Sequence, residues 1–330
     1  MSAEILLDVK NLRKHFSIGG EFLNVGKKWV RAVEDVNFTI AHGETLGLVG
    51  ESGSGKSTTA RLILRLLPAT AGEVWFDGVD VLRMDRTALK AVRRKMQVVF
   101  QDPYSSLDPR MTVEQTIGEA LTLRAGEGTR RQQIEQLLDL VGLPPSVTKR
   151  LPHEFSGGQR QRIGIARALA VRPSFIVADE PVSALDVSMQ SQILNLLVDL
   201  QREFGLTYLF ISHDLSVVKH LANRVAVMYL GHVVEIASKR ELYARPLHPY
   251  TGALLAAVPS FEYGRLRRHF VAAAGEIPSP VNPPPGCPYS SRCPRMTEEC
   301  QAAMPPLRPH GENRFVACYH PLEATMSAAS

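Results

Sequence analysis

The sequence predicts an α/β fold built on a mostly parallel β-sheet with helices on both faces. Three observations support this prediction. Apolar runs of strand length alternate along the chain with stretches of helical spacing, which is the pattern of strands joined by crossover helices. Two of these runs are apolar throughout and end in polar residues, as strands inside a covered sheet do. Hydrophobic residues make up 45% of the chain and charged residues 22%, a composition typical of folded globular proteins.

The expected elements follow one another from residue 5. Residues 5–49 are expected to form short strands, with apolar alternation at 36–40 and an apolar run typical of a buried strand at 45–50. A helix is expected over 58–67, where Pro68 ends it because proline cannot continue the backbone hydrogen bonding. Residues 112–142 also have helical spacing. Further strands are expected at 72–78, 96–100, 177–180 and 208–213.

Charge and hydropathy exclude several classes of protein. The net charge is +5, from 38 Lys+Arg against 33 Asp+Glu, and no concentrated basic stripe indicates a nucleic-acid binder. No stretch approaches the roughly 18 uninterrupted apolar residues of a membrane span. The first residues do not resemble a signal peptide, because Glu4 and Asp8 interrupt them. We therefore expect a cytosolic chain whose role at a membrane, if it has one, comes through a partner.

The segment Gly50–Ser57, GESGSGKS, matches the phosphate-loop pattern G-x-x-x-x-G-K-[ST] between an expected strand and an expected helix. Glycines let the backbone N–H groups turn inward around phosphate oxygens, and the helix N-terminus adds unpaired N–H groups. A match by chance in this length has a probability of about 1%. The expected ATP-binding residues of this segment are Gly50, Ser52, Gly53, Ser54, Gly55, Lys56, Ser57 and Thr58, with Ser57 also on Mg²⁺.

A second candidate is the apolar run Phe175–Ala178, which ends in Asp179 and Glu180. Asp179 can place its carboxylate near Mg²⁺, and Glu180 stands where a carboxylate could polarise an attacking water. An acidic turn after a core strand would be the ordinary interpretation of such a pair. The presence of a phosphate loop in the same chain favours the catalytic interpretation.

The segment Phe155–Arg162, FSGGQRQR, is a second Ser/Gly-rich loop that opens a helix. With the phosphate loop, the Asp-Glu pair, Gln101, the segment Ser183–Asp186 and His213 in this order, the chain resembles an ABC-transporter nucleotide-binding subunit over roughly residues 5–235. The resemblance implies a head-to-tail dimer with ATP between the phosphate loop of one subunit and the second loop of the other. The residues implied to contact the ATP of the partner subunit are Ser156, Gly157, Gly158, Gln159 and Asp186.

The resemblance also implies roles for three single residues. Gln101 would sense Mg²⁺ or water through its neutral amide. His213 would donate a hydrogen bond to the γ-phosphate. Together with Glu180, these two residues are the expected catalytic residues. Phe16 is the candidate for stacking on adenine. Trp29 is an alternative aromatic residue, and a place in the core is an equal alternative for Phe16.

Three further segments narrow the resemblance to ATPase subunits of bacterial oligopeptide/dipeptide importers. They are 100–113, 179–190 and 247–255. Two residues depart from the usual pattern: Phe155 stands where many ABC proteins have Leu, and Asp108 where these importers more often have Asn. The sequence does not identify the transported solute: dipeptides, longer peptides, cell-wall peptides and chelated nickel are all alternatives.

All four cysteines lie near the C-terminus, at Cys287, Cys293, Cys300 and Cys318. No two are separated by the two to four residues usual in structural zinc sites, and the spacing differs from compact ferredoxin motifs. Six prolines at 278–288 exclude regular helix or strand beside them. The resemblance implies that these cysteines bind a [4Fe–4S] cluster in at least some importer ATPases. Zinc, free thiols and disulfides remain alternatives.

Together these expectations define a P-loop NTPase of the ABC type, with an N-terminal antiparallel β subdomain and a helical subdomain at roughly 104–160. The nucleotide-binding domain would span 1–235, and 236–330 would be a Cys/Pro-rich extension with its four-cysteine segment at 287–318. The implied function is ATP hydrolysis that powers peptide import at the cytoplasmic face of the membrane. The implied partners are a second, identical or similar ATPase subunit, two permease subunits and an extracytoplasmic substrate-binding protein, with no nucleic acid. A soluble ABC ATPase acting on nucleic acid or ribosomes is the alternative.

Overall fold

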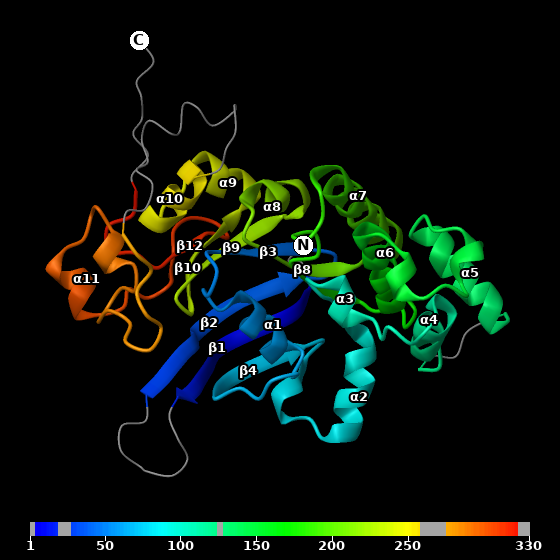
Figure 1. The fold of residues 1–330 in the computed structure, drawn as a ribbon. Coiled ribbons are helices and arrows are strands. Elements are labelled where there is room, and N and C mark those ends of the chain that lie inside the picture. Colours follow the sequence, from blue (N-terminus) through cyan, green and yellow to red (C-terminus); the bar gives the residue numbers. More distant parts are fainter. Residues whose placement is uncertain (1–3, 19–27, 124–127, 258–274, 323–330) are drawn as a thin grey trace. The chain divides into compact units, whose positions relative to one another are not determined.

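A computed structural model describes residues 4–18, 28–123, 128–257 and 275–322 (Figure 1). The chain divides into two compact units, each described by itself. Unit 1 comprises the residues up to Leu6, Ile40–Thr45 and Phe76–Ile211, and unit 2 comprises Leu7–Thr39, Leu46–Trp75 and the residues from Ser212 onward. Among the described residues, no helix is both long and apolar enough to cross a membrane.

The described strands are β1 (Ile5–Ile18), β2 (Lys28–Ala41), β3 (Thr45–Val49), β4 (Ala71–Phe76), β5 (Val79–Asp80), β6 (Met96–Val99), β7 (Phe175–Asp179), β8 (Thr207–Ser212), β9 (Arg224–Tyr229), β10 (His232–Ser238), β11 (Arg308–Pro309) and β12 (Phe315–Val316). The α-helices are α1 (Lys56–Ile63), α2 (Arg86–Lys95), α3 (Pro103–Ser106), α4 (Val113–Leu121), α5 (Arg130–Leu140), α6 (Gly157–Leu169), α7 (Val187–Phe204), α8 (Leu215–Leu221), α9 (Lys239–Ala244), α10 (Pro249–Ala257) and α11 (Glu298–Ala302). Short 3₁₀ turns are η1 (Val81–Arg83), η2 (Pro145–Val147), η3 (Pro152–Glu154) and η5 (Ser290–Arg292).

Unit 1 is built on the parallel strands β6, β7 and β8, with β7 in the middle. In the register, Val177 of β7 pairs with Val98 of β6 and with Leu209 of β8. Every residue of β7 and β8 is buried, which explains why their sequences are apolar runs without alternation. The expected parallel strands are therefore confirmed.

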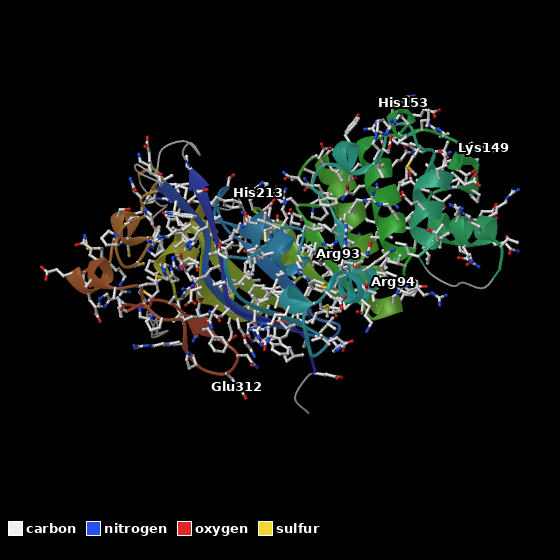
Figure 2. The ribbon with its side chains drawn as sticks, turned by 90° about the horizontal axis from the view of Figure 1, so that it is seen from below. Arg93, Arg94, Lys149, His153, His213 and Glu312 are labelled. Atoms are coloured by element: carbon white, nitrogen blue, oxygen red, sulfur yellow. The ribbon has the colours of Figure 1, made fainter. Side chains whose placement is uncertain are left out.

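Helices α4 to α7 of unit 1 pack against one another around α6 (Figure 1). The stretch 112–142, expected to be helical, holds two helices. Thr112 begins α4 and Thr129 begins α5, each with a capping box in which the threonine hydroxyl and the glutamine three residues later satisfy backbone groups of the first turn. Figure 2 labels Lys149 and His153, which lie between α5 and α6.

Unit 2 contains β3 parallel to β9, and β9 antiparallel to β10. β12 pairs with β10 through Glu235 and Ile236, and β11 pairs with β12. The C-terminal extension thus adds two strands beside β10, which the sequence analysis did not predict because each has only two residues. The proline-rich residues 278–288 form neither helix nor strand, as expected.

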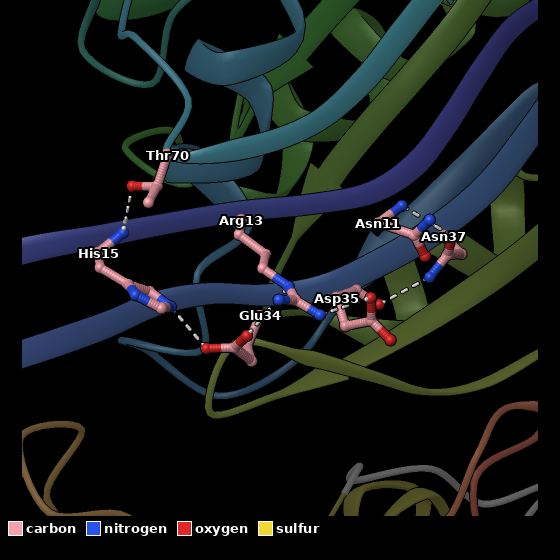
Figure 3. Close-up of polar contacts among 7 residues, drawn as sticks. All are labelled: Asn11, Arg13, His15, Glu34, Asp35, Asn37 and Thr70. Carbon is pink, nitrogen blue, oxygen red and sulfur yellow. Dashed lines mark hydrogen bonds and ion pairs between the residues drawn. The ribbon is translucent and has the colours of Figure 1, made fainter.

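The long strands β1 and β2 of unit 2 form a small sheet with β4, in the order β2-β1-β4. Figure 3 shows the polar side chains that join them. Arg13 of β1 contacts both Glu34 and Asp35 of β2, at 3.2 and 3.4 Å, and His15 contacts Glu34 at 2.6 Å. The His15 backbone N–H donates to the Thr70 hydroxyl just before β4, at 3.0 Å. These contacts fix the strand on which Phe16 lies.

Helix α1 differs from its expected bounds. It begins at Lys56, two residues earlier than expected, and ends at Ile63, well before Pro68. Arg65 adopts a left-handed backbone with φ 50°, and the Leu66 N–H turns back to the Arg61 carbonyl oxygen at 2.8 Å. A C-terminal turn of this kind ends the helix, so proline is not what stops it.

Candidate nucleotide-binding site

The phosphate loop of unit 2 has the context that its motif requires, since β3 enters it and α1 leaves it. Gly50, Gly53 and Gly55 have φ of 155°, 78° and 104°. A Cβ on Gly50 would lie 2.1 Å from the Met228 carbonyl oxygen, and one on Gly55 would lie 2.3 Å from the Ala32 carbonyl oxygen. Both positions therefore need glycine, for the backbone conformation and for space.

The cationic end of Lys56 lies inside this loop. Its Nζ donates to the Gly50 carbonyl oxygen at 2.8 Å, to the Glu51 carbonyl oxygen at 3.0 Å and to the Ser54 hydroxyl at 3.4 Å. The N-cap of α1 is Gly55, which offers no side chain to cap the helix. The first N–H groups of α1, from the turn that holds Ser57 and Thr58, thus give the loop a positive end suited to phosphate.

Two residues that the sequence analysis assigned no role hold Glu51 of this loop. The Arg292 guanidinium pairs with the Glu51 carboxylate through two contacts, at 2.9 and 3.2 Å. The Tyr250 hydroxyl accepts the Glu51 backbone N–H at 2.9 Å. Tyr250 lies in the segment 247–255 that carried part of the family resemblance, but no local pattern in the sequence indicates either contact.

In unit 1 the structure brings Gln101 and Glu180 together. The Gln101 Nε2 donates to Glu180 Oε2 at 3.0 Å. Because Val99 of β6 pairs with Ala178 of β7, residues two positions beyond fall opposite each other. Asp179, the last residue of β7, is buried with 7% exposed surface.

The backbone of Glu180 is in the left-handed region, with φ 48°. Its N–H donates to the Ile211 carbonyl oxygen at 3.0 Å, and its own carbonyl oxygen accepts from the Ser183 N–H at 3.2 Å and hydroxyl at 3.1 Å. A non-glycine residue in this conformation costs about 1–3 kcal/mol and occurs at active sites as well as in ordinary turns. These hydrogen bonds hold the strained turn in place.

The second Ser/Gly-rich loop, also in unit 1, forms the start of α6. Ser156 is the N-cap: its hydroxyl accepts the Gln159 N–H at 3.3 Å, and the Gln159 Oε1 accepts the Ser156 N–H at 3.1 Å. A Cβ on Gly158 would lie 2.1 Å from Met189 Cε, and one on Gly157 would lie 3.2 Å from Leu185. The glycines allow α6 to approach the segment that leads into α7.

Asp186 caps the N-terminus of α7 in unit 1. Its Oδ1 accepts from the Met189 N–H at 2.9 Å and the Ser188 hydroxyl at 2.7 Å. These hydrogen bonds lower the pKa of the Asp186 carboxyl, the bond from the Met189 backbone most of all. His213, the first residue after β8, belongs to unit 2 and is exposed (Figure 2).

Neither candidate for the adenine-stacking residue is a core residue. Phe16 is 37% exposed and Trp29 is 49% exposed. The Lys14 Nζ lies 5.0 Å from the centre of the Phe16 ring and donates to the Pro68 carbonyl oxygen at 2.7 Å. The alternative of a buried core role for Phe16 is therefore wrong, whereas its contact with adenine stays a prediction.

The four cysteines of unit 2 line one small cavity of about 10 Å³, together with His248 and Tyr289. All four thiols are free, so no disulfide joins them. Burial raises the pKa of Cys287 to about 11 and that of Cys318 to about 12. In this structure, the His, Cys, Asp and Glu side chains of the described residues form no preassembled group of three or more in a metal-binding arrangement.

Two protein-family models match parts of the chain. Residues 33–183 match the ABC transporter family, and residues 234–300 match the oligopeptide/dipeptide transporter C-terminal region. A probable peptide ABC transporter ATP-binding protein of Sinorhizobium fredii is 52% identical, over 96% of this chain and 90% of the relative. The oligopeptide transport ATP-binding protein AppF of Bacillus subtilis is 49% identical, over 96% of this chain and 97% of the relative.

Solved structures show the same fold. The ATP-binding cassette MJ0796, in a dimeric post-hydrolysis state with ADP and Pi, is 32% identical with a TM-score of 0.63, over 71% of this chain and 99% of that one. The CbiO1 protein of Clostridium perfringens, part of an ABC transporter complex, is 27% identical with a TM-score of 0.63. The match covers 73% of this chain and 91% of that one. The expected α/β fold of an ABC ATPase is thus confirmed. This chain belongs to the family of ABC transporter ATP-binding proteins and is an ATPase.

Proposed function

We propose that the chain powers the import of di- and oligopeptides by hydrolysing ATP at the cytoplasmic face of a membrane. The names of relatives such as AppF, and the oligopeptide/dipeptide transporter C-terminal region, support peptides as the solute. The observation that best supports ATP hydrolysis is the contact between Gln101 and Glu180. In this contact the neutral amide of Gln101, after β6, donates to the carboxylate of Glu180, after β7, and so orients it.

ATP would be held by the phosphate loop. Its backbone N–H groups and the N-terminus of α1 suit the phosphates, and the cation of Lys56 suits the β- and γ-phosphates. Ser57, Asp179 and Gln101 offer a hydroxyl, a carboxylate and an amide, which are the oxygen ligands that Mg²⁺ prefers. The ion would neutralise charge that develops on the phosphates during transfer.

Hydrolysis would proceed by attack of one water molecule on the γ-phosphorus, yielding ADP and phosphate. Glu180 would accept a proton from this water as a general base, with its carboxylate oriented by the Gln101 amide. His213 would donate a hydrogen bond to the γ-phosphate and stabilise charge there.

The loop Ser156–Gln159 and Asp186 would contact ATP bound by a second ATPase subunit. A chain with one phosphate loop and one such loop needs a partner to complete each site. The dimeric state of MJ0796 with ADP and Pi supports this arrangement. The rest of the proposed assembly comprises two permease subunits, contacted through residues of roughly 104–150, and an extracytoplasmic substrate-binding protein.

Two measurements test this function. Uptake of a labelled dipeptide or oligopeptide should be lost in cells that lack the chain and restored by the wild type, but not by Glu180→Gln produced at the same level. Affinity purification from solubilised membranes should recover integral membrane subunits. Recovery of nucleic acid or ribosomes without such subunits would instead support a soluble ABC ATPase and would overturn the importer function.

We propose further that Cys287, Cys293, Cys300 and Cys318 hold a [4Fe–4S] cluster with a structural role. What supports this proposal is that all four cysteines line one small cavity, and cysteines are the usual ligands of such clusters. The raised pKa values of Cys287 and Cys318 mean that buried thiolates need a compensating cationic group. Protein purified without oxygen should contain about four irons per chain. Zinc in place of iron, or thiols that bind neither metal, would contradict the cluster.

A further inference from the structure

Glu51 of the phosphate loop is held at two points by residues from the C-terminal part of unit 2. Arg292 binds its carboxylate with both terminal nitrogens, Nη1 to Oε2 at 2.9 Å and Nη2 to Oε1 at 3.2 Å. The Tyr250 hydroxyl accepts its backbone N–H at 2.9 Å. A two-point contact of this kind fixes the orientation of the Glu51 peptide, and Glu51 directly follows Gly50 in the loop.

The ion pair lies in a sheltered environment. The side chain of Arg292 is only 7% exposed and that of Glu51 is 25% exposed. The Tyr229 hydroxyl accepts a further bond from Arg292 Nη1 at 3.3 Å, and the rings of Tyr229 and Tyr289 each lie 5.9 Å from the guanidinium. The hydrogen bond to Glu51 raises the pKa of Arg292 above its ordinary value. A bidentate arginine–carboxylate pair has a defined geometry and is stronger than a neutral hydrogen bond.

The two residues that hold Glu51, Arg292 and Tyr250, are each linked to the cavity lined by the four cysteines. Arg292 ends η5, between Cys287 and Cys293, and the Cys293 N–H donates to the Ser290 carbonyl oxygen of the same turn at 3.3 Å. On the other side, His248 lines the cavity, and its Nδ1 accepts the Tyr250 N–H at 3.1 Å. A change in how the cysteines are held would therefore move the residues that hold the loop.

We propose that Arg292 is a positioning residue of the nucleotide site, through which the order of the four-cysteine segment sets the affinity of the phosphate loop for ATP. Tyr250 is the second such residue. The inference rests on the proposed role of the phosphate loop in binding ATP. It does not require the cysteines to hold iron, because any ligand or packing that orders η5 would place Arg292 in the same position.

The first test compares ATP binding by full-length variants, with a fluorescent ATP analogue and Mg²⁺. Arg292→Gln should raise the dissociation constant about 5- to 20-fold, because Glu51 loses its partner and the loop loses its fixed orientation. Arg292→Lys should have an intermediate effect, since it keeps the charge and loses the bidentate geometry. Arg308→Gln, at an exposed arginine of β11, is the matched control and should bind as the wild type does.

A double-mutant cycle separates positioning from general damage. Glu51→Gln should weaken binding by a similar factor, and the double variant Glu51→Gln/Arg292→Gln should be no weaker than either single variant. Fully multiplicative losses would overturn the proposal, as would an unchanged dissociation constant in Arg292→Gln with an unchanged melting temperature. If Lys56→Ala also left ATP binding intact, the proposed role of the phosphate loop would fail instead.

The second test asks whether the cysteines act through Arg292. Cys300→Ser should weaken ATP binding in the wild-type chain and have at most a twofold effect in the Arg292→Gln chain. Iron and zinc content are measured on the same samples, so absence of metal would reject the cluster without deciding this inference. An equal loss in both chains would show that the cysteine segment acts by another route and would overturn the coupling.

Discussion

Gln101 and Glu180 lie directly opposite each other at the ends of two neighbouring parallel strands, with Nε2 and Oε2 3.0 Å apart. The register of β6 and β7, in which Val99 pairs with Ala178, brings the ends of the two strands close together, and the left-handed backbone of Glu180 ends β7 there. The contact joins a neutral amide to the proposed general base. It therefore orients the carboxylate without adding a charge next to it.

The Gln101 amide should contribute to the rate of hydrolysis. Gln101→Ala removes the donor that orients Glu180, and we expect kcat to fall on the order of 10-fold, which corresponds to about 1.4 kcal/mol. Phosphate release at saturating ATP measures this effect. Gln97→Ala is the control, because Gln97 lies on the same segment but donates to the Arg93 carbonyl oxygen, at 2.6 Å. A loss of the same size in both variants would contradict the orienting role.

Two glycines of the same helix should respond differently to alanine. Gly158→Ala places a methyl group 2.1 Å from Met189 Cε, so the flexible end of the methionine must move, with little loss of stability. Hydrolysis should fall, because the methyl group lies in the loop proposed to contact the ATP of a second subunit. Gly164→Ala meets nothing within 4 Å and should stabilise the helix by about 0.5–1 kcal/mol with unchanged hydrolysis. Melting temperature and phosphate release test both. A normal rate in Gly158→Ala would argue against a functional role for this loop.

His232 at the start of β10 should make the protein less stable in acid. Desolvation lowers its pKa below 6.5; Glu34 and Asp35 oppose this shift, while Arg31 and Arg13 add to it. The unfolded chain therefore binds a proton first, and the free energy of unfolding should fall as pH drops through 6.5 toward the lowered value. His232→Gln should reduce this loss, measured by urea unfolding at about pH 7.5 and about pH 5.5.

The control for this prediction is His310→Gln, at an exposed histidine. This variant should keep the pH dependence of the wild type. An equal pH dependence in the wild type and His232→Gln would show that the burial of His232 does not contribute to acid sensitivity.

The local parts of the site were predictable from the sequence. A phosphate loop is a contiguous pattern whose glycines are required by backbone geometry, as the carbonyl oxygens that crowd Gly50 and Gly55 show. The apolar run before Asp179 likewise indicates a strand buried on both faces. In both cases the residues that carry the signal are contiguous, so the sequence displays the pattern even though the groups that crowd them come from distant segments.

The contacts of Glu51 were not predictable, because Arg292 is 241 residues away and no periodicity relates them. The pairing of β12 with β10 was not predictable for a different reason: β12 has only two residues, which are too few to show the alternation of a strand. The early end of α1 depended on the left-handed conformation of Arg65, which its sequence does not reveal. The first two of these features are set by the packing of distant segments.

The most direct test of the account is phosphate release by the purified full-length chain and by Glu180→Gln, with ATP binding measured on the same samples. We expect Glu180→Gln to bind ATP at least as tightly as the wild type and to lose hydrolysis by a factor of about 10²–10⁴. Hydrolysis at the wild-type rate in Glu180→Gln would contradict the assignment of Glu180 as the general base. The same result would show that the contact between Glu180 and Gln101 does not serve catalysis.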